Sequence, residues 1–180
     1  EVLEHVKAQG EVFLLEGACV PYGESNVWFP IATALSNYLD LDTSLSVGPA
    51  RTAGLQRARA MFPGMPDADA EKLVDVFMHL MGYASGLDKL DASQARSTIH
   101  RAVARVFEIR AEQGTMVLSI DDLHWADPVL LDLLESLVTS VGRHAFLLVT
   151  AARPGTELAW PPHSDRTTTL SLTLQPLTRT

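Results

Sequence analysis

Cysteine is almost absent from this sequence of 180 residues, and long apolar runs are absent altogether. The single cysteine, Cys19, cannot form a disulfide within the chain, and no cluster of cysteine and histidine has the spacing of a zinc site. A reducing cytoplasm is therefore the expected setting. No apolar run reaches the roughly 20 residues that a membrane-spanning helix requires, so we expect no association with a membrane.

Basic residues are also few. The chain has 14 lysines and arginines against 22 acidic residues, a net charge of -8, and the basic residues do not gather into a stripe. Proteins that bind nucleic acid directly use such stripes to neutralise backbone phosphates, so direct binding of nucleic acid is not expected. What the chain does have is 47% apolar residues, which is enough to build the core of one domain.

Short apolar runs at three places predict strands that are buried on both faces, as in a parallel sheet. They are Val12 to Leu15, Met116 to Ile120 and Phe146 to Thr150. Leucines that alternate at positions 170, 172 and 174 predict a fourth strand.

Between these runs, apolar residues recur at helical spacing. The clearest helix follows a capping-box pattern at Asp91 and Gln94, has its apolar positions between Ala95 and Phe107, and ends near Gly114. Another helix follows Asp127-Pro128. Helices that alternate with short strands predict an α/β fold with three layers, α/β/α, and a parallel sheet. Helices are also predicted for a segment that ends at Gly10, for Phe29 to Leu39 and for Glu71 to Met81. Residues 40–70 are predicted to hold one short helix among loops.

Paired carboxylates follow the second strand directly, as Asp121 and Asp122. In open α/β sheets the ligand lies at the carboxyl ends of the strands, and an apolar strand that ends in acids is the Walker B pattern. Asp121 is our candidate for holding a magnesium-bound water, and Asp122 is placed to orient or deprotonate an attacking water. The alternative is that both residues only end the strand and cap a turn.

The third strand is followed by Thr150 and Arg153 on the same predicted edge of the sheet. Guanidinium is a permanent, bidentate ligand of phosphate, so Arg153 is a candidate for contacting a terminal phosphate. Thr150 is the weaker candidate for the same nucleotide site. The alternative is a surface arginine that pairs with a neighbouring acid.

The segment from Asp121 to Pro128, DDLHWADP, closely resembles the Walker B signature of STAND-type P-loop ATPases. These AAA-like domains occur in bacterial LuxR-type and cyclase-linked regulators. Three weaker likenesses occur in the family's order: residues 17–30 resemble the strand after the P-loop, residues 148–154 the sensor strand, and residues 174–177 the closing LxPL. The resemblance implies ATP or ADP with Mg²⁺ as cofactors, Asp121 at the metal, Asp122 and Arg153 in catalysis, and Thr150 and Arg153 at the nucleotide. His124 and Trp125 match the signature too, and we interpret them as a packed pair that fixes the loop.

The P-loop pattern GxxxxGK[ST] is absent from the sequence, because none of the lysines, Lys7, Lys72 and Lys89, follows a glycine. The resemblance places the P-loop before the helix that ends at Gly10. We therefore expect residues 1–180 to be a partial ATPase domain that carries the Walker B and sensor-1 part, lacks the first strand, and is not nucleotide-competent alone. Its sheet would then have a gap, with open hydrogen-bonding edges on both sides.

The favoured function is an ATP-binding and hydrolysing switch in a multidomain cytoplasmic regulator, with neighbouring effector domains as partners and a homo-oligomer as a possible assembly. The alternative is a pseudo-ATPase that serves as a protein-interaction module. An α/β hydrolase is disfavoured, since the sequence has no GxSxG elbow.

Overall fold

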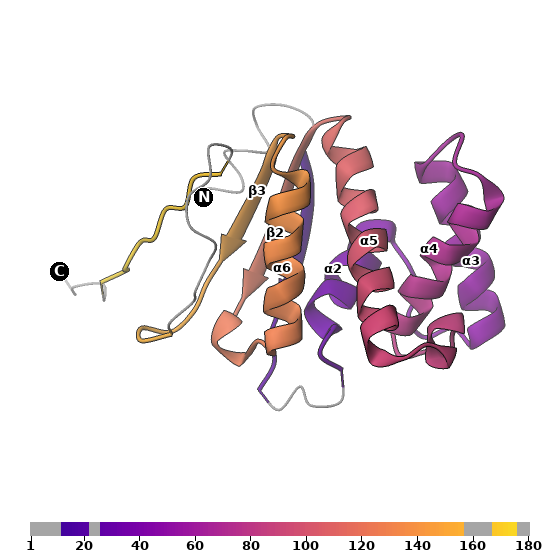
Figure 1. The fold of residues 1–180 in the computed structure, drawn as a ribbon, viewed down its shortest axis with the longest axis horizontal. Helices are drawn as coiled ribbons and strands as arrows, with labels where there is room; N and C mark the ends of the chain where they lie inside the picture. The colour runs from indigo at the N-terminus through magenta and orange to yellow at the C-terminus, as the bar shows by residue number, and fades with distance from the viewer. Residues whose placement is uncertain (1–11, 22–25, 157–166, 176–180) are drawn as a thin grey trace.

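The computed structural model describes residues 12–21, 26–156 and 167–175. Its centre is a parallel sheet of three strands in the order β1-β2-β3 (Figure 1). Strand β1 spans Val12–Ala18, β2 spans Thr115–Asp121 and β3 spans Phe146–Thr150. The predicted α/β class and the three parallel strands are therefore confirmed. Burial on both faces holds for β2 alone among them, since β1 and β3 are partly exposed and Leu147 of β3 is 40% exposed. The predicted helix ending at Gly10 lies outside the described residues.

The register brings equivalent apolar residues of the three strands side by side. Leu15 pairs with Leu118 and Leu118 pairs with Leu148, and at the end of the sheet Ala18 pairs with Asp121. Because the strands are parallel, their carboxyl ends meet at one edge. Asp121 and Thr150 end their strands at that edge, and Asp122 and Arg153 follow directly after them.

The helices and short 3₁₀ turns lie between the strands along the chain. Their bounds are α2 Phe29–Leu39, α3 Val47–Met61, α4 Asp67–Leu80, η1 Gly86–Lys89, α5 Ala92–Ala111, η2 Leu123–Trp125 and α6 Pro128–Val141. Local sequence explains where α5 and α6 begin. The capping box forms, since the Asp91 carboxylate accepts from the backbone N–H of Gln94 at 2.9 Å. Asp127 caps α6 by accepting from the N–H of Val129 at 2.7 Å, before a helix that starts with proline.

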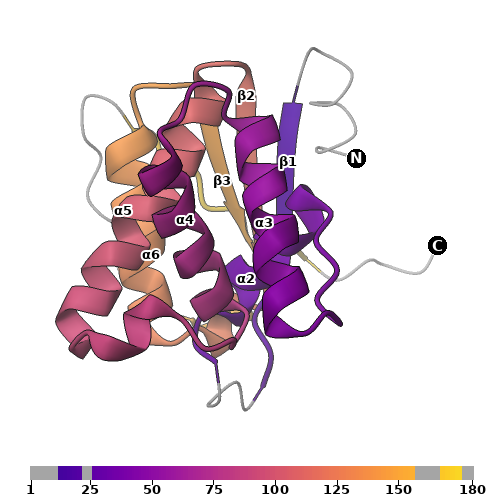
Figure 2. The ribbon, with the colours of Figure 1, turned by 90° about the vertical axis from the view of Figure 1, so that its right-hand side faces the viewer.

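The described helices cover one face of the sheet (Figure 2). This follows from the topology, because the strands are added in sequence order and each crossover between parallel strands is right-handed, which puts every connecting helix on the same side. The core lies between that face and the helices, and it includes Leu15, Leu118 and Phe107. Phe107 of α5 meets Phe146 of β3 edge to face, with ring centroids 5.7 Å apart.

Two predictions from local pattern need correction. Residues 167–175 form no strand, and Leu170, Leu172 and Leu174 are 78%, 73% and 87% exposed. A strand needs a hydrogen-bonding neighbour, and in the described residues β3 pairs only with β2. Residues 40–70 hold the 15-residue helix α3 rather than a short helix among loops.

Pro49 does not shorten α3. It lies in the first turn of α3, where a missing N–H breaks no helical hydrogen bond.

No described helix is long and apolar enough to cross a membrane.

Candidate functional site

The two carboxylates lie where β2 leaves the sheet between its neighbours. The backbone oxygen of Asp121 accepts from the N–H of Cys19, which follows β1, at 2.9 Å. On the other side, the N–H of Ala151 donates to Ile120 at 3.1 Å and the N–H of Leu123 donates to Ala151 at 2.8 Å. Backbone hydrogen bonds therefore hold the chain on both sides of Asp121-Asp122, and the side chain of Asp121 is exposed.

Asp122 has an unusual backbone conformation. Its φ of 54° and ψ of 37° are left-handed, which costs a non-glycine residue on the order of 1 kcal/mol. This conformation turns the chain from β2 into η2, whose Leu123 is buried. The Asp122 side chain remains 61% exposed. Strained residues of this kind concentrate at functional sites, and here the strain lies on the predicted catalytic acid.

Arg153 and the turn after β2 meet at this edge. The Arg153 guanidinium lies over the ring of Trp125, 5.7 Å from its centroid. Trp125 is 43% exposed and belongs to η2, directly after the acids. The expected gathering of Asp121, Asp122 and Arg153 at one edge thus occurs in the structure. Thr150 ends β3 opposite Ile120 and is half-buried. The chemical roles assigned to these four residues stay predictions.

Two further residues border the acids. Cys19 is buried, and its burial together with the nearby Asp122 carboxylate raises the pKa of the thiol to about 11. His124 lies under the turn, its side chain 10% exposed and its ring 5.0 Å from that of Trp125. The interpretation of His124 and Trp125 as a packed pair agrees with this contact. The sequence could not show that the ring nitrogens of His124 are buried without a hydrogen-bond partner among the described residues.

The donor set fits magnesium better than zinc. Among the described residues no group of three or more histidine, cysteine, aspartate or glutamate side chains could hold a metal. Mg²⁺ takes oxygen ligands, keeps several waters and commonly needs only one or two carboxylates, with phosphate oxygens completing its shell. The exposed Asp121 can supply such a carboxylate, and Arg153 can neutralise phosphate charge beside it.

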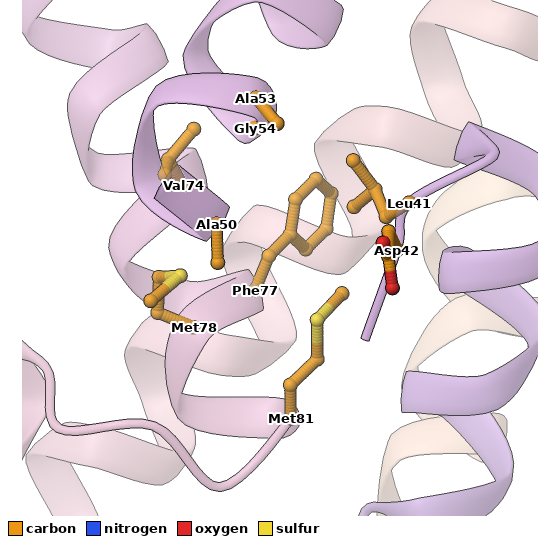
Figure 3. A pocket seen from close by; sticks show the side chains of 9 residues that line it. All are labelled: Leu41, Asp42, Ala50, Ala53, Gly54, Val74, Phe77, Met78 and Met81. Carbon is orange, nitrogen blue, oxygen red and sulfur yellow. The ribbon is translucent and has the colours of Figure 1, made fainter. Parts of the chain in front are cut away.

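Two hollows of the helical layer are lined by none of the predicted site residues. A cavity of about 10 Å³ holds at most one water (Figure 3). It is lined by Leu41, Asp42, Ala50, Ala53, Gly54, Val74, Phe77, Met78 and Met81. An open groove of about 340 Å³ runs along α5 and α6, where Arg96 pairs with Asp132 at 3.4 Å.

The chain is similar to a known domain family and to a known protein. The family described as AAA ATPase domain matches residues 1–149. An uncharacterized protein of Rhizobium meliloti (strain 1021) is 31% identical over 166 residues, which are 91% of this chain and 15% of that protein. The chain thus spans about a seventh of that relative's length. No solved structure matches the chain.

Proposed function

Because this chain belongs to the AAA ATPase domain family, we propose that it forms part of an ATP-driven regulatory switch of the STAND type, within a multidomain regulator of the LuxR-type or cyclase-linked kind. The observation that carries the proposal is the meeting of two carboxylates and an arginine at the ends of adjacent parallel strands. Asp121 ends β2 and Asp122 follows it, and Arg153 follows β3 and contacts the turn after the acids.

Each of these side chains has a distinct task in the proposed reaction. Bound Mg²⁺, held through Asp121, would supply neutralising charge to the β and γ phosphates. Asp122 takes a proton from the attacking water, because its carboxylate is exposed at the edge that the nucleotide would face. Arg153 donates hydrogen bonds to the terminal phosphate. To do so, its guanidinium would either leave the Trp125 ring or reach the phosphate while it stays over the ring. The Thr150 hydroxyl is a further donor at the same edge.

The proposal requires a phosphate cradle from outside these 180 residues, since they contain no GxxxxGK[ST] pattern. The much greater length of the relative supports a module within a larger protein. In such a protein, the nucleotide state of this domain would control neighbouring effector domains or self-assembly.

The test is ATP turnover by the full-length protein and by its Asp122→Asn variant. Asparagine keeps the size of the side chain but cannot accept the proton, so we expect hydrolysis to fall about 100-fold or more while the ATP dissociation constant changes little. Asp69→Asn is the matched control, because Asp69 lies exposed in the first turn of α4. Equal turnover by the Asp122→Asn variant and the parent would remove Asp122 from the mechanism.

The second candidate is a pseudo-ATPase that serves as a protein-interaction module. The absence of the P-loop pattern from these residues favours it. Under this alternative the full-length parent itself neither binds ATP at micromolar concentration nor hydrolyses it. Measuring ATP binding by the parent therefore separates the two candidates before any variant is made.

A further inference from the structure

The imidazole of His124 is buried with its hydrogen-bonding capacity unused. Its side chain is 10% exposed, and neither Nδ1 nor Nε2 has a hydrogen-bond partner among the described residues. Buried polar groups are nearly always paired, and an unpaired group calls for a physical explanation. The location of His124, two residues after Asp122 in the turn at the end of β2, points to that explanation.

Among the residues that the structure describes, the acidic group nearest to the ring is the carboxylate of Asp122. Nδ1 of His124 lies 3.9 Å from Oδ1 of Asp122. A hydrogen bond between these atoms needs a separation of about 2.7–3.0 Å, so the gap is roughly 1 Å. Rotation of the Asp122 side chain is the easier way to close it, because that side chain is 61% exposed. The His124 ring is buried and packs on Trp125 with centroids 5.0 Å apart.

The backbone of the turn keeps the two residues in a fixed relation. The carbonyl of Asp122 accepts from the N–H of Trp125 at 2.9 Å, which closes η2 around His124. The left-handed conformation of Asp122 aims its backbone into this turn. The backbone therefore keeps the two side chains near each other, and the exposed Asp122 side chain borders solvent into which it can rotate.

We propose that His124 is a positioning residue for Asp122: its Nδ1–H donates a hydrogen bond to one carboxylate oxygen and leaves the other oxygen free to face the attacking water. The hydrogen bond selects the tautomer with the proton on Nδ1, since only a donor can satisfy an ionised carboxylate. This inference rests on the proposed function in assigning Asp122 to the reaction, but the hydrogen bond itself needs no nucleotide.

Three substitutions in the full-length protein separate positioning from packing. His124→Asn puts an amide donor near the place of Nδ1, His124→Gln puts one near Nε2, and His124→Phe fills the space without a donor. We expect the asparagine variant to keep ATP hydrolysis within about threefold of the parent. The glutamine and phenylalanine variants should lose about tenfold or more in kcat, with unchanged affinity for ATP, as for other residues that orient a reacting group.

Two further outcomes bear on a purely structural role. The phenylalanine variant should melt close to the parent, because it removes the buried Nε2, which has no partner among the described residues, and the exposed Asp122 carboxylate that loses its donor stays hydrated. In an Asp122→Asn background, His124→Phe should change kcat no further. Full activity of the phenylalanine variant, or rescue by glutamine and not by asparagine, would overturn the proposal.

A readout that is independent of hydrolysis keeps the two proposals apart. Nitrogen-15 NMR of histidine-labelled full-length protein, assigned with the His124→Asn variant, reports which ring nitrogen carries the proton. We expect protonated Nδ1 in the parent, with its resonance shifted by Asp122→Asn. A proton on Nε2 and no response to Asp122→Asn would disprove the hydrogen bond. A parent that shows the expected tautomer but hydrolyses no ATP would instead disprove the proposed function.

Discussion

Gly17 of β1 is the position where one added methyl group tests the packing beside the site. A Cβ at Gly17 would overlap the carbonyl oxygen of Pro30, and it would lie 3.0 Å from the carbonyl carbon of Pro30 and 3.2 Å from Cδ1 of Ile120. Pro30 is in the first turn of α2, so the missing side chain lets this helix approach the sheet two residues before Cys19. Gly17→Ala must push α2 and β1 apart.

The cost follows from what the methyl group would meet. Overpacking a tight core typically costs 1–3 kcal/mol. The obstructing atoms here belong to backbone, which cannot rotate away as a side chain can, so we expect about 3 kcal/mol, the upper end of that range. Each 1.4 kcal/mol is a factor of ten, so the folding equilibrium should shift by about 100-fold.

Chemical denaturation followed by circular dichroism measures this loss, with Gly48→Ala as the matched control. A Cβ at Gly48 has no atom within 4 Å, and Gly48 lies in the first turn of α3. Alanine favours a helix over glycine, so the control should be as stable as the parent or more stable by up to about 0.5 kcal/mol. If Gly17→Ala proved as stable as Gly48→Ala, the close approach of α2 to β1 would be refuted.

Three shorter predictions follow from single features. The pKa of the Cys19 thiol is about 11 in the folded chain and 9.0 in its ordinary state, so the unfolded chain loses this proton first as pH rises. As pH rises between those two pKa values, the melting temperature of the parent should fall relative to that of Cys19→Ala. The same pH dependence of melting in both proteins would contradict the burial of the thiol. Asp91→Ala should destabilise the protein by about 1 kcal/mol through loss of the α5 cap. The control Asp69→Ala should change the denaturation midpoint little. Similar midpoints for the two variants would show that the capping box does not stabilise the protein. Calorimetry on the 180 residues alone should show ATP–Mg²⁺ binding weaker than micromolar by several powers of ten, since each missing charge-assisted bond forfeits about 1.5–3 kcal/mol; micromolar binding would show that the site is completed differently.

Much of the fold was determined by local sequence pattern. The leucines of α6 recur at helical spacing, and Leu130, Leu133, Leu134 and Leu137 are all buried as that spacing requires. The short apolar runs predicted parallel strands, and parallel strands put Asp121, Asp122 and Arg153 at one edge. The sequence was sufficient here because strand direction alone decides which end of the sheet a residue occupies.

Helix α3 shows one limit of such patterns. Its buried residues are only Gly54 and Ala58, and a Cβ at Gly54 would lie 3.3 Å from Cγ1 of Val74 in α4. Small residues let two helices approach closely but leave no apolar stripe, so the contact could not be predicted from periodicity.

The sequence by itself determined the parallel strands, the main helices and which side chains leave the strand ends together. Only the tertiary structure decided the left-handed backbone of Asp122, the contact of Arg153 with Trp125 and the burial of the unpaired His124 ring. It also decided that Leu170, Leu172 and Leu174 form no strand despite their alternation. The physical reason is common to these cases: hydrogen-bond partners, ring contacts and burial depend on segments distant in the chain, about which a local pattern of residues carries no information.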